Sequence, residues 1–238
     1  MKWPEVTAVF GGTFDPPHVG HRIAVAGLFE QPQVARVVIV PAGLPALKQA
    51  RTLADQRWAM AKLAFTTDST KNPRFGGPVE LNDLELRRAA ANPSAPSYTY
   101  DTLLELGRTF PNLAFVVGTD QLPDLERWHR FPELLGLCHW IVLKRQGSEE
   151  ALFERCLSRW QAGGLLTPDA SVGDRWSIRT VGRDPVVLKL VETRAPDISS
   201  SLIRETLQKT GAPPDGVLSP EVLDYLKENG LYGTRISR

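Results

Sequence analysis

The chain has 238 residues, of which 42% are hydrophobic and 23% charged, and its formal net charge is +1. These values are typical of a soluble globular protein that is long enough to bury a sizeable core. Basic residues are dispersed, so the charge pattern gives no reason to expect nucleic-acid binding. No apolar stretch approaches the roughly 20 residues of a membrane span, and no targeting segment is recognisable, so we expect a cytoplasmic protein without membrane contact.

The first 145 residues alternate between two kinds of segment. Short apolar runs closed by glycine or proline are typical of strands that are buried on both faces of a parallel sheet. Segments with apolar residues at helical spacing lie between these runs. We predict strands at 6–10, 35–43, 112–120 and 139–145, and helices at 21–30, 53–65 and 97–110. This alternation predicts a doubly wound α/β fold with a parallel sheet.

The remainder of the chain is less regular until its last forty residues. We predict a helix at 149–162, a Gly-, Pro- and Asp-rich loop at 163–175 and a short strand at 186–191. Two further helices follow, one at 199–209 that opens on three serines and one at 219–230 with serine and proline at its start. We therefore divide the chain into an α/β domain at 1–196 and a small C-terminal helical subdomain at 197–238 that packs on it.

Two cysteines, Cys138 and Cys156, are far apart in the sequence and form no CxxC pair. This number and spacing do not match a disulfide framework or a zinc knuckle. We therefore expect both residues to act as small, at least partly buried hydrophobic side chains.

The stretch "GGTFDPPHVGH" at 11–21 joins the first strand to the first helix. Ligands of doubly wound sheets bind beyond the carboxyl ends of the strands, where the strand order reverses. We therefore expect this stretch to meet "PAGLPALK" (41–48) and "GTDQLPDLERW" (118–128) at one edge of the sheet.

The glycines and histidines of this stretch favour phosphate binding. Glycines let the backbone approach a phosphate closely, and the amides at a helix start stabilise anionic oxygens. His18 and His21 are three residues apart, so on a first helical turn they face the same way. A zinc site is disfavoured, because a third ligand is missing and the helix N-terminus is the positive end of the dipole. A structural alternative stays open, in which one histidine caps the helix and the other packs.

The same stretch resembles the nucleotidyltransferase signature with its HxGH core, and "DISSSLIRE" (197–205) resembles the second signature, ISSTxIR. Five further stretches lie in family order and resemble bacterial nicotinate-nucleotide adenylyltransferases. They are "VPAGLPALK" (40–48), "DQRWAM" (55–60), "ELRRAAANPSAPSYTYDTL" (85–103), "VVGTDQL…ERWHRFPELL" (116–135) and "LSPEVLDYLKENGLY" (218–232). Residues 146–196 match no motif of the family.

The resemblance implies a Rossmann-like nucleotidyltransferase that joins ATP to nicotinate mononucleotide in NAD biosynthesis, with release of pyrophosphate and without a covalent intermediate. It implies catalytic roles for His18, His21 and Arg204, with Mg²⁺ arriving on the phosphates of ATP. The implied ATP-binding residues are Gly11, Gly12, Thr13, Phe14, His18, Gly20, His21, Ser199, Ser200, Ser201 and Arg204. The implied acceptor-binding residues are Lys48, Thr99, Gly118, Asp120, Trp128 and Arg145.

Several alternatives stay open at this point. Trp128 is equally a candidate for the core, and Asp120 for a helix cap. The chain differs from the family pattern at two positions. The family often has histidine immediately before the lysine of the stretch at 40–48, and this chain has Leu47 there. The last hydroxyl residue of the second signature is threonine in the family pattern and Ser201 in this chain. Nicotinamide mononucleotide or another phosphorylated acceptor, or a non-catalytic nucleotide-binding module, are the rival functions, and an oligomer is possible.

Overall fold

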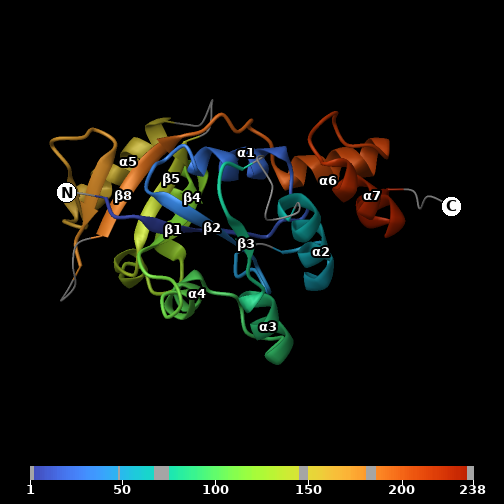
Figure 1. Ribbon diagram of the computed structural model, residues 1–238, viewed down its shortest axis with the longest axis horizontal. Helices are drawn as coiled ribbons and strands as arrows, with labels where there is room; N and C mark the ends of the chain where they lie inside the picture. Colours follow the sequence, from blue (N-terminus) through green and yellow to red (C-terminus); the bar gives the residue numbers. More distant parts are fainter. Residues whose placement is uncertain (1–2, 48, 67–74, 145–149, 181–185, 235–238) are drawn as a thin grey trace.

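The computed structural model describes residues 3–47, 49–66, 75–144, 150–180 and 186–234. Within these ranges the strands form an eight-stranded sheet in the order β3-β2-β1-β4-β5-β8-β7-β6 (Figure 1). The strands are β1 Val6–Gly12, β2 Val34–Pro41, β3 Val79–Leu81, β4 Leu113–Gly118, β5 His139–Lys144, β6 Leu166–Pro168, β7 Arg175–Ile178 and β8 Val186–Glu192. Neighbours from β3 to β8 pair in parallel, whereas β7 and β6 add an antiparallel edge.

Helices cover both faces of the sheet, which confirms the predicted doubly wound α/β fold. They are α1 Val19–Leu28, α2 Ala54–Phe65, α3 Leu84–Ala91, α4 Thr99–Leu106, α5 Glu150–Ala162, α6 Ser200–Thr210 and α7 Pro220–Glu228. The described residues also contain three 3₁₀ segments, η1 Thr119–Arg127, η2 Glu133–Gly136 and η3 Leu231–Gly233. None of the described helices is long and apolar enough to cross a membrane.

The two hydrophobic cores follow from the alternation of side chains along the strands. Ala8 of β1 lies in one core together with side chains of α1, α2, α6 and α7, while its neighbour Val9 lies in the other core together with side chains of α4, α5 and η1. Val37 and Val38 of β2 divide in the same way, and all four residues are 0% exposed. Because both faces are covered, the central strands are largely apolar, which is the pattern that makes these strands recognisable.

Several predicted segments need correction. The loop predicted at 163–175 contains the strand β6, which pairs with β7 at the edge of the sheet. The prediction also omitted β3, β7 and α3. Strands of three or four residues carry too little periodicity to be recognised, and their pairing partners are set by the tertiary fold. The helix predicted at 97–110 is only the eight residues of α4, and the end of the strand predicted at 112–120 is the start of η1.

The C-terminal helices pack beside α1 and α2, to the right of the sheet in Figure 1. Val222 and Leu226 of α7 lie in the same core as Val25 of α1 and Phe65 of α2. Ser219 caps α7, since its hydroxyl accepts a hydrogen bond from the backbone N–H of Val222 at 3.4 Å. This packing brings the second signature next to the loop that follows β1.

Candidate active site

A cavity of about 330 Å³ opens at the carboxyl ends of β1, β2 and β4. The strand order reverses between β1 and β4, so the loops that follow these strands diverge and leave a crevice. The segments 11–13, 42–47 and 120–128 all contribute to its lining, as the sequence predicts. Among the predicted site residues, those that line the cavity are Gly11, Gly12, Thr13, Thr99, Asp120 and Trp128.

The two histidines of the first signature lie side by side at the start of α1, with their ring planes tilted by 34°. His18 is the N-cap, only 3% exposed, and its ring centroid lies 3.7 Å from that of His21. The backbone N–H of His18 donates to Nδ1 of His21 at 3.2 Å. Since Nδ1 accepts this bond, the proton of neutral His21 resides on Nε2, where it can be donated to an anion.

Gly20 allows this arrangement. A Cβ at position 20 would lie 3.1 Å from the ring of His18 and 3.1 Å from Ile198. A side chain at position 20 would therefore push against His18 and against the chain that leads into α6, and glycine avoids this crowding. Phe14 lies at the other side, 1% exposed, with its ring edge-on to His21 at 5.1 Å. The Phe14 ring is therefore packed against His21 and is not exposed to a ligand, and its predicted contact with ATP stays a prediction.

The second signature contacts the first through backbone carbonyls. The hydroxyl of Ser199 caps α6 by accepting from the N–H of Leu202 at 3.2 Å. Ser200 donates its hydroxyl to the carbonyl of Pro16 at 2.8 Å. Arg204 donates through Nη1 to the carbonyl of Asp15 at 2.7 Å and through Nη2 to the hydroxyl of Ser201 at 3.0 Å. Residues 189 positions apart in the sequence are therefore in direct contact.

Arg57, which sequence reasoning did not select, joins the loops that follow β1 and β2. Its guanidinium is 2% exposed and donates to the carbonyls of Ala42, of Gly43 at 2.7 Å and of Thr13 at 3.4 Å. Burial lowers the pKa of Arg57, an effect that the nearby Asp15 opposes. Arg57 lies in the "DQRWAM" stretch, so the resemblance to the family already pointed to this segment. The role of the Arg57 side chain depends on contacts with residues that are distant in the sequence.

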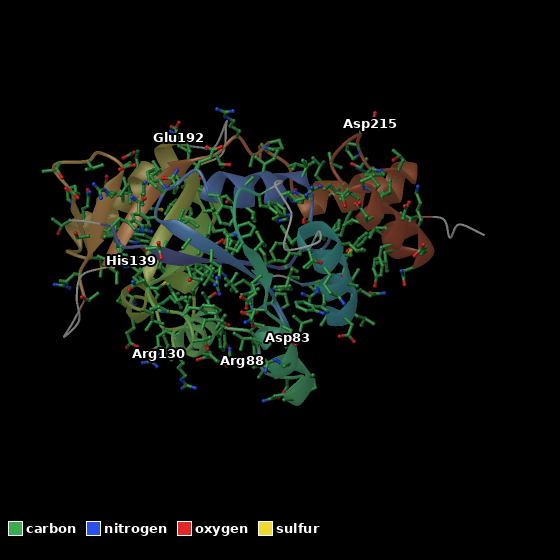
Figure 2. The ribbon with its side chains drawn as sticks, viewed as in Figure 1. Asp83, Arg88, Arg130, His139, Glu192 and Asp215 are labelled. Atoms are coloured by element: carbon green, nitrogen blue, oxygen red, sulfur yellow. The ribbon has the colours of Figure 1, made fainter. Side chains whose placement is uncertain are left out.

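The aromatic wall, defined here as residues 97–102 and 127–130, is held together by ring contacts. The rings of Tyr98 and His129 stack with centroids 4.2 Å apart and planes 20° apart. The guanidinium of Arg130 lies 4.2 Å from the centre of the Tyr100 ring. Trp128 is half-buried, with its ring 6.0 Å from that of Phe115 at 78°. In Figure 2, Arg88 and Arg130 mark this lower side of the molecule, near α3 and α4.

Glu85 at the start of α3 lies between this wall and the loop after β2. It lines the cavity, is 8% exposed, and accepts a hydrogen bond from the hydroxyl of Thr102 at 2.7 Å. Burial raises the pKa of Glu85, while hydrogen bonds from Thr102, the backbone of Gly43 and Ser97 act in the opposite direction. Glu85 thereby links three segments that meet at the cavity.

The remaining predicted residues are placed as follows. Asp120 is exposed at the start of η1, and its Oδ1 would lie 2.2 Å from a Cβ at Gly118, so a side chain at position 118 would displace the Asp120 carboxylate. Lys48 and Arg145 fall outside the described residues.

Cys138 and Cys156 are free and buried as expected, and burial raises the pKa of the Cys138 thiol to about 12. In the described part of the chain, no group of three His, Cys, Asp or Glu residues could hold a metal ion.

Known proteins share this architecture and these motifs. A family model described as cytidylyltransferase-like matches residues 9–206. The probable nicotinate-nucleotide adenylyltransferase of Pectobacterium atrosepticum is 36% identical over 234 residues, which cover 96% of this chain and 99% of that protein. The chain belongs to this cytidylyltransferase-like family, among the nicotinate-nucleotide adenylyltransferases. Another family member, from Dehalococcoides mccartyi, is 31% identical over 95% of this chain and 96% of its own length.

Solved structures confirm the fold of the family. Plasmodium falciparum nicotinic acid mononucleotide adenylyltransferase, complexed with NaAD, aligns with a TM-score of 0.70 at 19% identity. That alignment covers 98% of this chain and 100% of the other. The alignment with the Pectobacterium relative extends into residues 146–196, because a 96% coverage leaves too few residues to omit that stretch. The family assignment thus applies to nearly the whole chain.

Proposed function

We propose that this chain transfers the adenylyl group of ATP to nicotinate mononucleotide, giving nicotinate adenine dinucleotide and pyrophosphate. The observation that carries the proposal is the meeting of the HxGH and SSSxIR motifs at the end of β1, beside a cavity with an aromatic wall. The motifs supply cationic and amide donors for phosphates, and the wall supplies a flat surface for a pyridine ring. Relatives with 36% and 31% identity carry the corresponding name.

The reaction needs positioning and charge stabilisation rather than an enzyme nucleophile. A phosphate oxygen of the mononucleotide attacks the α-phosphorus of ATP, and the bond from that phosphorus to the bridging oxygen breaks as pyrophosphate leaves. Nε2 of His21, the imidazole of His18 and the guanidinium of Arg204 would stabilise the negative charge that moves to pyrophosphate. Backbone amides from Gly11 to Thr13 would contact the phosphates from the strand end.

On the acceptor side, Trp128 and Thr99 would hold the pyridine ring and its carboxylate, and Asp120 a ribose hydroxyl. Enzymes of this family generally use a divalent metal. We propose Mg²⁺ in this role, held mainly by the phosphates of ATP, because this ion keeps much of its hydration and binds proteins through few ligands.

Pyrophosphate release from ATP tests the proposal directly. Purified protein is supplied with ATP, Mg²⁺ and one of three acceptors, namely nicotinate mononucleotide, nicotinamide mononucleotide and pantetheine phosphate. We expect the highest kcat/KM with nicotinate mononucleotide, and chromatography should show the dinucleotide in equal amount to pyrophosphate. A preference for another acceptor would replace the proposed substrate, and the absence of release with every acceptor would refute the enzymatic assignment.

A further inference from the structure

A buried carboxylate in the first signature accepts three hydrogen bonds from two segments that are distant in the sequence. Asp15 is 2% exposed. Its Oδ1 accepts hydrogen bonds from the hydroxyls of Tyr232 and Thr52, each at 2.5 Å, and its Oδ2 accepts from the N–H of Arg51 at 2.7 Å. Three donors on one buried carboxylate offset the cost of removing its charge from water.

The backbone of the same segment holds the second signature. The carbonyl of Asp15 accepts from Arg204, and the carbonyl of Pro16 accepts from Ser200. His18 begins α1 two residues later. The side chain of Asp15 therefore anchors the short segment that positions both sets of candidate phosphate-binding groups.

The C-terminal partner of Asp15 is itself firmly placed. Tyr232 is 9% exposed within η3, directly after α7, and 217 residues separate it from Asp15. Two residues further on, the hydroxyl of Thr234 donates to the carbonyl of Leu226 at 2.7 Å and fastens this segment to α7. Burial and the contact with Asp15 raise the pKa of Tyr232, so its hydroxyl remains a donor across the physiological pH range.

We propose that Asp15 is a positioning residue for ATP, and that the Tyr232 hydroxyl, together with Thr52, holds it in place. The inference rests on the proposed function for its kinetic readout. In this arrangement the C-terminal segment does more than cover the core. Through Tyr232, this segment fixes the position of the HxGH groups relative to the SSSxIR groups. Loss of the Tyr232–Asp15 contact therefore weakens binding of the triphosphate. The aromatic wall, 97–102 and 127–130, keeps its geometry.

The chain offers a matched pair of variants. Tyr232→Phe removes the hydroxyl that contacts Asp15, whereas Tyr225→Phe removes a tyrosine hydroxyl from α7, in the same C-terminal part of the fold. For Tyr232→Phe we expect KM for ATP and Kd for a non-hydrolysable ATP analogue to rise about tenfold, because the variant loses one hydrogen bond to a charged group. KM for nicotinate mononucleotide should stay within about twofold. Tyr225→Phe should leave all three constants unchanged.

A second donor and a second readout separate positioning from plain structural support. Thr52→Val removes the other hydroxyl on Oδ1 and should raise KM for ATP in the same selective way as Tyr232→Phe. Amide hydrogen exchange measured without ligand should become faster at residues 13–18 and 51–53 in Tyr232→Phe, and not in Tyr225→Phe.

The results of these experiments distinguish a positioning role from purely structural support. A fall in melting temperature with unchanged ATP constants, or faster exchange confined to 231–234, would overturn the positioning role. If wild-type protein turns over no acceptor, the proposed function fails, but analogue binding and hydrogen exchange still decide whether Asp15 and Tyr232 act together. If the wild type binds no analogue, unchanged exchange at 13–18 in Tyr232→Phe refutes the inference.

Discussion

The two sides of the cavity are built by different interactions. On the phosphate side, buried or partly buried charged side chains bind backbone and hydroxyl groups across the fold: Arg57 and Arg204 donate to backbone carbonyls, and Asp15 accepts from hydroxyls. On the acceptor side, rings stack and the contacts are largely between segments 97–102 and 127–130. Hydrogen bonds require a narrow range of distances and angles, so they fix the positions of the donor groups. Ring contacts provide apolar surface and tolerate small shifts of one ring relative to the other.

This difference has a functional meaning. Transfer of an adenylyl group requires stabilisation of a moving negative charge, which depends steeply on the placement of donors. Recognition of a flat acceptor requires area and a few polar contacts. We therefore expect substitutions on the phosphate side to affect catalysis and stability strongly, and substitutions on the acceptor side to affect one KM.

The largest effect is expected at His18. Replacement by alanine should lower kcat by about 10²- to 10³-fold, because a donor to the developing charge is lost. His18 also caps α1, so His18→Asn serves as the control, since asparagine is a good N-cap. Steady-state pyrophosphate release measures both variants. Full activity in His18→Asn would show that capping is the role of His18, and would remove it from the phosphate side.

Arg57 should give the next largest effect, in this case on stability. Arg57→Met leaves three backbone carbonyls, one of them buried, without their donor, so the free energy of unfolding should fall by about 3 kcal/mol in urea titrations. The matched control is Arg87→Met on α3, whose ion pair with Asp83 is largely exposed and should contribute less than about 0.5 kcal/mol. Equal losses in the two variants would contradict the interpretation of Arg57 as the link between the loops.

Trp128 tests the acceptor side. Trp128→Ala should raise KM for nicotinate mononucleotide about tenfold through loss of stacking area, with KM for ATP within about twofold. Trp128→Phe should recover most of the loss. A comparable change in both KM values would mean that the two sides are not separable, and that Trp128 supports the fold rather than the acceptor.

Glu85 should give the smallest effect, visible as a pH dependence. Burial raises its folded pKa above the unfolded value, so the folded state binds its proton more readily. The stability that this proton contributes is present below the unfolded pKa, near 4.3, and is lost as the pH rises through the folded pKa. The unfolding free energy of wild type relative to Glu85→Gln should therefore decrease from pH 4 to pH 7. A constant or increasing difference would show that Glu85 is not strained by burial.

Local patterns in the sequence were sufficient for the central part of the fold and for one side of the site. The strands β1, β2, β4 and β5 are mostly apolar because both faces of the sheet are buried, and this property can be recognised without a structure. The phosphate motifs are equally local, since a glycine turn, a helix start and two histidines lie within eleven residues. Trp128 and Thr99 were selected by resemblance, and the structure places both at the cavity.

The tertiary structure alone decided the edge of the sheet and the partners of the buried charges. The strands β3, β6 and β7 have three or four residues each, and they exist because neighbouring strands offer hydrogen bonds to them. Asp15, Arg57 and Glu85 lie within recognisable motifs, yet their contacts reach up to 217 residues along the chain. The local sequence around an aspartate, glutamate or arginine does not show whether its side chain is exposed or buried. Only its burial, and the donors or acceptors that burial demands, give it a defined role in this protein.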